Sequence, residues 1–348
     1  MWYATRESVK SSVDVKFSAY FDARVDEALE SASRKVDGLC GRSPGFFAPT
    51  IATRYFDWPR KNMSPSWTLW LESNYLISAT SLVSGGVTIA TADYDLRRSD
   101  DLDAPPYDRI EIDLSSTAAF SAGDTHQRSV AVTGLWGNTQ EHVTATTLAE
   151  DLDTTETGAD VANSNAVGVG DVIRVGTEYL EVTGRSMVDT GQNTSALTAD
   201  KTGTSITGLT AGQIFSGEVL LIDGERMLVQ DASGTTATVQ RAYDGTTLAA
   251  HLVNTDIYAA RTLTIVRGSL GSTASAHTTA DAVTRLVFPG PVRQLARAYA
   301  IDQLMQEGAG YARVVGSGEN ERQATGRSIK DLEKDVRRDF KRTRTGVV

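Results

Sequence analysis

The sequence GDVIRVGTEYLEV at residues 170–182, with a second copy, GEVLLIDGERMLV, at residues 217–229, decides the fold. Each copy holds two short runs of apolar and β-branched residues on either side of a turn signal. Glu178 in the first copy and Glu225 in the second fall between these two runs. The two copies therefore predict two β-hairpins, 47 residues apart.

A second pair of copies follows. RAYDGTTLAAH at residues 241–251 matches RGSLGSTASAH at residues 267–277, at an offset of 26. Because the two offsets differ, a simple tandem repeat is excluded. We infer a nested duplication, in which one β unit at 215–258 is inserted between the halves of another, at about 167–185 plus 260–286. Solenoids and propellers need roughly three or more regular repeats, so this pattern disfavours them.

Helical periodicity flanks this β-rich middle on both sides. In residues 13–42, apolar side chains recur at steps of three or four, and residues 291–342 contain further helical segments. The N-terminal apolar positions are Phe17, Phe21, Val25, Ala28, Leu29, Ala32, Val36 and Leu39. We predict an α+β fold. In it, the N-terminal helix and the C-terminal helices form a helical core with a small β-sheet, and a large all-β region of nested units is inserted. The predicted divisions are 1–138, 139–286 and 287–348.

Composition limits the class of protein. Of the 348 residues, 40% are hydrophobic, which is enough for packed cores. No apolar run approaches the roughly 20 residues of a membrane helix, and the N-terminus has no hydrophobic signal segment. These features predict a protein kept in the cytoplasm where it is made, unless it leaves within a larger particle. Cys40 is the only cysteine, so an internal disulfide is impossible, and we expect it to be buried.

Charge is unevenly distributed along the chain, whose net charge is −10. Residues 129–173 carry seven carboxylates and no Lys or Arg. Residues 327–345 carry eight basic against four acidic groups, a net +4 that leaves −14 for the rest. A basic tail on an acidic body is typical either of a solvated helix face or of a segment that contacts an acidic partner.

The last helical segment has a narrow apolar stripe surrounded by charge. Such a seam suits docking into a partner groove, with the basic side chains around it in contact with an acidic surface. The predicted docking residues are Ile329, Leu332, Val336, Phe340, Arg337, Arg338, Lys341, Arg342 and Arg344.

The sequence argues against an enzyme and predicts no catalytic, metal or cofactor site. His251 and His277 occupy the same position in two repeat copies without further ligands nearby, which favours a repeated structural role. Glu178 and Glu225 are predicted to lie in exposed turns. A carbohydrate-binding β protein is the alternative from another class, with Trp136 and Glu141 as its best candidates.

Several short motifs, taken in order, resemble head-to-tail connector (adaptor) proteins of long-tailed bacteriophages. The first helix ends in VDGLCGR and is followed by a strand, and the later strands and the C-terminal helix occur in the order of that family. The motifs are VDGLCGR at 36–42, TRYFDWP at 53–59, GVTIATADYDL at 86–96, IEI at 110–112, VAVTGLWG at 130–137 and the helix at 291–307.

The resemblance implies a structural virion protein of the phage neck, assembled in the host cytoplasm. Such a protein forms a ring of about twelve copies below the portal and extends the DNA channel toward the tail. Its implied partners are further copies of itself, the portal protein and the next neck protein, a stopper or tail terminator. DNA would pass through without sequence-specific binding, since an acidic wall repels phosphate. Removal of residues 328–348 is expected to abolish portal docking without unfolding the body. Another phage tail or baseplate structural protein is the nearest alternative.

Overall fold

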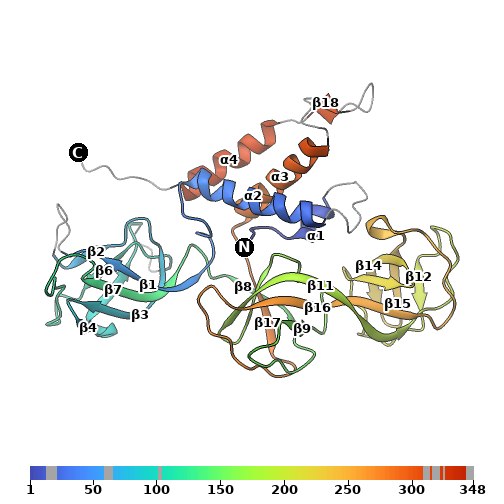
Figure 1. Cartoon of the computed structure of the whole chain (residues 1–348), viewed down its shortest axis with the longest axis horizontal. Helices are drawn as coiled ribbons and strands as arrows, with labels where there is room; N and C mark the ends of the chain where they lie inside the picture. Colours follow the sequence, from blue (N-terminus) through green and yellow to red (C-terminus); the bar gives the residue numbers. More distant parts are fainter. Residues whose placement is uncertain are drawn as a thin grey trace.

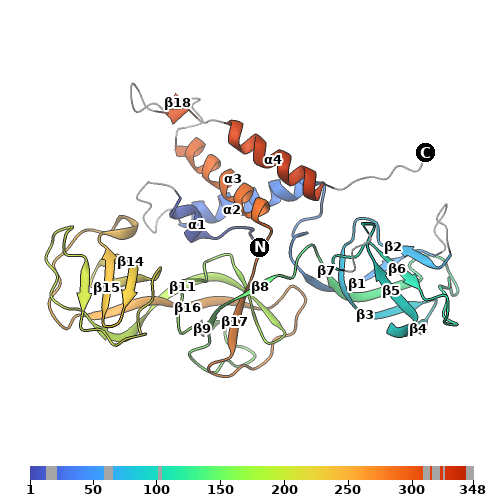
Figure 2. The same cartoon turned by 180° about the vertical axis from the view of Figure 1, so that it is seen from behind.

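The computed structural model describes residues 1–12, 22–58, 66–100, 104–308, 314–315, 322–323 and 326–341. It is a mixed α+β fold with antiparallel sheets, which confirms the predicted class. A helical hub lies above a row of three β bodies, and the two outer bodies lie on opposite sides of the hub (Figures 1 and 2). Residues Phe17, Phe21, Arg342 and Arg344, which the sequence analysis singled out, lie outside the described residues.

The hub brings both ends of the chain together. Its helices are α1 (Arg6–Lys10), α2 (Asp22–Cys40), α3 (Gly290–Gly308) and α4 (Gly326–Phe340), and the short strands β18 (Val314–Val315) and β19 (Arg322–Gln323) pair between α3 and α4. Thr5 caps α1 by accepting a hydrogen bond from the Ser8 N–H. In α2 the apolar residues recur on one face, and that face is buried. The same hydrophobic cluster includes Val172, Tyr179 and Leu286 from the β region, so helices and strands share this core.

The N-terminal β lobe, residues 50–136, forms one end of the row. Its 4-stranded sheet has the order β1-β7-β3-β4, and a 3-stranded sheet has the order β2-β6-β5. The bounds are β1 (Thr50–Phe56), β2 (Thr68–Trp70), β3 (Leu76–Ser84), β4 (Val87–Ile89), β5 (Tyr94–Arg97), β6 (Arg109–Ile112) and β7 (Val130–Trp136), with a 3₁₀ turn η2 (Thr91–Asp93). Side chains alternate between buried and half-buried along β7, and both sheets contribute to one cluster.

The other two β bodies share a 10-stranded sheet. Its strands are β8 (His142–Thr147), β9 (Gly158–Asp160), β10 (Val172–Val175), β11 (Glu178–Asn193), β12 (Ser205–Thr207), β13 (Val219–Ile222), β14 (Glu225–Ser233), β15 (Thr236–Gln240), β16 (Asp256–Ser269) and β17 (Ala282–Leu286), with a 3₁₀ turn η3 (Tyr243–Gly245). The long strands β11 and β16 pair along nearly their whole length and cross from the middle body to the outer one (Figure 1). Each body has its own buried cluster, so the sheet serves two separate cores.

The two bodies are copies of one another. The proximal unit, beside the hub, has the strand order β8-β17-β10-β11-β16-β9, and the distal unit has the order β11-β16-β13-β14-β15-β12. Their registers also correspond: Thr262 pairs with Asp160 in the proximal unit, as Thr236 pairs with Thr207 in the distal unit. The distal unit therefore replaces the turn between β11 and β16 of the proximal one.

Two stretches without clear sequence patterning also belong to these units. From sequence alone, residues 137–166 are weakly patterned and residues 186–213, rich in Thr, Ser, Gly and Asp, are expected to form a surface segment. The structure instead places β8 and β9 in the first, and the end of β11 and β12 in the second. Both units therefore extend beyond the predicted bounds. The signal is weak because these strands are short and carry many threonines, whose side chains fit a half-exposed sheet edge.

Candidate functional site

The predicted docking helix, α4, uses its apolar stripe within the chain. Val336 is fully buried in the hub core, and Ile329, Leu332 and Phe340 pack against the same cluster. The Phe340 ring meets the Phe47 ring edge-on, at 5.2 Å between centroids. The stripe therefore packs against the chain's own core, and because deletion of 328–348 would expose that core, we expect this deletion to destabilise the body rather than leave it intact.

The outer face of α4 is charged and exposed. Lys330, Lys334, Arg337, Arg338 and Lys341 all lie there. The Arg338 guanidinium lies 3.1 Å from Asp335, and Lys334 lies 3.5 Å from Asp331, so part of this charge is neutralised along the helix. Three of the predicted docking residues, Arg337, Arg338 and Lys341, therefore lie on one exposed face of α4.

Arg42 holds the end of α4 against the N-terminal β lobe. Its guanidinium donates to the Phe340 carbonyl oxygen at 3.3 Å, to the Ser73 carbonyl oxygen at 3.2 Å and to the Tyr75 hydroxyl at 2.9 Å. It also lies over the rings of Phe46 and Tyr75. Because a helix C-terminus leaves carbonyls without intrahelical partners, this contact fixes where α4 points.

Glu225, predicted in an exposed turn, is fully buried, so that prediction is wrong. The Arg241 guanidinium donates two hydrogen bonds of 2.8 Å to the Glu225 carboxylate, and His251 Nε2 lies 2.9 Å from the same carboxylate. The backbone N–H groups of Ala242 and Ala249 donate to it as well. Burial by itself raises the pKa of Glu225, but these donors outweigh burial and hold the pKa at about 2.

The proximal unit repeats the Glu–Arg–His contacts of this cluster. Arg267 donates to both oxygens of Glu178 at 2.8 and 2.9 Å, and His277 Nε2 lies 2.8 Å from the carboxylate. Glu178 is likewise buried, with burial opposed by the same kinds of donor and a pKa of about 2. The matching Arg and His of each repeat therefore close their unit around a buried carboxylate, a structural role for both histidines.

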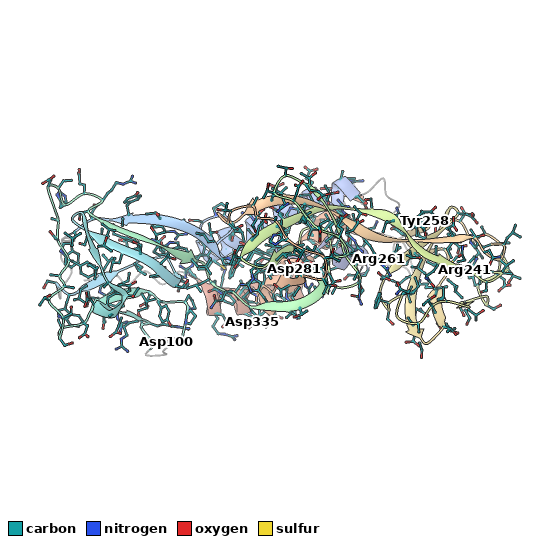
Figure 3. The ribbon with its side chains drawn as sticks, turned by 90° about the horizontal axis from the view of Figure 1, so that it is seen from below. Asp100, Arg241, Tyr258, Arg261, Asp281 and Asp335 are labelled. Carbon is teal, nitrogen blue, oxygen red and sulfur yellow. The ribbon has the colours of Figure 1, made fainter. Side chains whose placement is uncertain are left out.

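The clusters also position loops that carry no recognisable repeat. Arg241 donates to the carbonyl oxygens of Thr198 and Gly203, and Arg267 donates to those of Asp153 and Glu156. Figure 3 labels Arg241 in the distal unit, Asp281 in the middle of the row and Asp100 at the opposite end. Each guanidinium thus ties the loop before β12 or β9 to the hairpin that carries the glutamate.

Large apolar side chains are most exposed on the two outer bodies of the row. Val87 and Leu114 of the N-terminal β lobe are 66% and 71% exposed, and Leu252 and Val253 of the distal unit are 80% and 62% exposed. Among the described large apolar residues, those on the hub and proximal unit stay below 50%. Each outer body thus carries exposed apolar side chains.

The carbohydrate-binding alternative loses its main residue. Trp136 is fully buried, and its indole N–H donates to the Ala52 carbonyl oxygen at 2.9 Å. Its ring packs with Phe56 and lies under Arg54, so it cannot stack on a sugar at the surface.

Comparisons with protein-family models, with curated proteins and with solved structures gave no match. Within the described ranges, no helix has the length and apolar character to cross a bilayer. The same residues contain no group of three or more His, Cys, Asp or Glu side chains arranged to hold a metal ion.

Proposed function

We propose that this chain is a structural, ring-forming head-to-tail connector of a tailed bacteriophage. The observation that carries the proposal is the presence of the most exposed apolar residues on the two outer bodies of the row. Val87 and Leu114 belong to the N-terminal β lobe, and Leu252 and Val253 belong to the distal unit. Contact between unlike ends of successive copies is heterologous, and it closes into a ring when the rotation allows.

The distal loop supports a role for its apolar pair. Leu252 and Val253 occupy the positions of Thr278 and Thr279 in the proximal copy, and the residues that follow, Asn254 and Ala280, share a positive φ of 67° and 70°. The two loops thus have similar backbones and different surfaces. Threonines suffice for the turn itself, so the apolar pair suits a contact with another molecule.

In this proposal the terminal helices form the ancestral connector core, and the nested β units are an insertion that carries the subunit contact. The hub keeps α4 outside the row of β bodies (Figure 1). The exposed basic face of α4, rather than its apolar stripe, then meets the portal. An acidic surface on the portal would complement Arg337 and Lys341.

Oligomer mass tests the ring. We expect native mass spectrometry of the purified chain to give a closed assembly of about twelve copies. The double variant Leu252→Asp/Val253→Asp should give monomers with unchanged circular dichroism. Val143→Asp is the matched control, because Val143 is 49% exposed on the proximal unit, where Arg285 pairs with it across the sheet. A monomeric unmodified chain, or an intact ring in the double variant, would contradict the proposed contact.

Portal docking has a separate test. Arg337→Glu/Lys341→Glu reverses charge on the exposed face of α4 and leaves the buried Val336 in place. We expect the variant to form rings but to lose co-purification with the portal of the same phage. Lys201→Glu, a reversal on the distal unit, should keep it. Retained docking by the α4 variant would refute the role of this face.

A further inference from the structure

A cavity of about 230 Å³ lies where the hub meets the proximal unit. Three segments far apart in the sequence line it: the chain's first residues, Gly170 with Asp171, and the stretch from the end of β17 to the first turns of α3. Its volume is below the roughly 300 Å³ at which drug-sized ligand pockets begin, so it suits a small group rather than a large cofactor.

Three guanidinium groups line this cavity: Arg285, Arg293 and Arg297. Arg293 and Arg297 are four residues apart on α3 and therefore lie on one face of the helix. Neither has a hydrogen-bond or ion-pair partner among the described residues, although the chain has a net charge of −10 and an excess of carboxylates. The positive end of α3, which begins at Gly290, adds to the potential in the same place.

The single carboxylate in the lining is paired with Arg285 rather than with the two arginines of α3. Asp171 is buried, accepts a hydrogen bond from the Gly168 N–H at 2.8 Å and lies 3.8 Å from Arg285. It is engaged with groups on its own side of the cavity. Arg293 and Arg297 therefore remain available to a group that enters from solvent.

We propose that this cavity is an oxyanion-binding site, in which Arg293 and Arg297 hold a phosphate or carboxylate group. A planar guanidinium matches such groups with two parallel hydrogen bonds, and two guanidiniums one helical turn apart can share one anion. Arg285, which pairs with Asp171, lies on the β side of the same cavity. A bound anion would join α3 to β17 and stabilise the junction of hub and proximal unit. The site does not depend on ring formation.

Inorganic phosphate is the first probe. We expect isothermal titration of the full chain, at constant ionic strength in chloride, to show saturable phosphate binding and a phosphate-dependent rise in Tm. Arg293→Ala/Arg297→Ala should weaken binding by at least about 10-fold, the loss expected for charged hydrogen bonds. Lys330→Ala/Lys334→Ala removes two positive charges elsewhere on the hub and should leave binding unchanged.

A second arm separates the two sources of the anion. Titration with acetate and with a short Glu-containing peptide tests for a carboxylate ligand under the same conditions. Tighter binding of the peptide than of phosphate would assign the site to an acidic partner segment, and the reverse order would assign it to phosphate. Equal binding of either probe by the Arg293/Arg297 variant and the unmodified chain, or no saturable binding of any probe, would overturn the site.

Discussion

Replacing Glu225 by glutamine should destabilise the distal unit by about 3–5 kcal/mol, the usual range for removing one partner of a buried ion pair. Arg241 is 1% exposed, so the substitution leaves a buried guanidinium without its counter-charge. The pKa of Glu225 gives a second estimate of this free energy. A fall from the usual 4.5 to about 2 corresponds to roughly 3 kcal/mol of preferential stabilisation of the carboxylate.

Hydrogen exchange can show whether the destabilisation is confined to the distal unit. Because each has a separate core, hydrogen exchange of the β13, β14 and β15 amides should accelerate in the Glu225→Gln variant by about 10²–10⁴-fold. Amides of β8, β10 and β17 should keep their protection. Glu178→Gln is the matched variant and should give the opposite distribution. The double variant Glu225→Leu/Arg241→Met removes both charges and should be less destabilised than Glu225→Gln alone.

The pH dependence of folding stability tests the direction of the Glu225 effect. Since the pKa of Glu225 is depressed in the folded state, its contribution is present above about pH 4.5 and is lost as the pH falls toward 2. Glu225→Gln should therefore flatten the acid limb of the stability curve. A loss of less than about 1 kcal/mol, or equal exchange in both units, would refute the assignment of the cluster as a buried structural clamp.

Three other predictions follow from single buried positions. Burial raises the pKa of Asp171 to about 7, so the folded state keeps a proton that the unfolded state loses, and stability falls as the pH rises from about 4 to 7. Asp171→Asn should remove this pH dependence and raise the unfolding free energy at pH 8 by about 2–4 kcal/mol in urea titrations. Val336→Ala leaves a cavity in the hub and should lower the unfolding free energy by about 1–3 kcal/mol, whereas Lys334→Ala on the exposed face should change it by less than 0.5 kcal/mol. A Cβ at Gly134 would overlap the Ser78 carbonyl oxygen, so Gly134→Ala should lower Tm through a loss of about 1–3 kcal/mol, and an unchanged Tm in calorimetry would show that β3 moves away freely.

The repeats in the sequence located the residues of both buried clusters but not their environment. Glu178 and Glu225 fall at turn signals, which usually lie at the surface. Their partners come from the second pair of repeats, 89 residues away for Arg267 and 16 for Arg241. An equivalent Glu, Arg and His in two copies is the signal that could have predicted the contact, because a repeated fold places equivalent residues together.

The α4 helix shows a second feature that the sequence could not predict, the surface that its apolar stripe contacts. Its periodicity correctly separates an apolar stripe from a charged face, because the helical period is a local property. Whether the stripe meets another protein or the chain's own core depends on where α2 and Phe47 lie. Those positions are set by residues almost 300 places earlier in the chain.

The sequence by itself determined the mixed α+β class, the faces of the helices and the nested order of the two β copies, since these follow from local periodicity and from identity between segments. Only the tertiary structure decided that Glu178 and Glu225 are buried, that the α4 stripe is covered, and that Arg293 and Arg297 line one cavity with Arg285. Burial, pairing and convergence of charge depend on long-range packing. A linear pattern of residues specifies which faces are apolar, but the surfaces that cover them are fixed only when the whole chain folds.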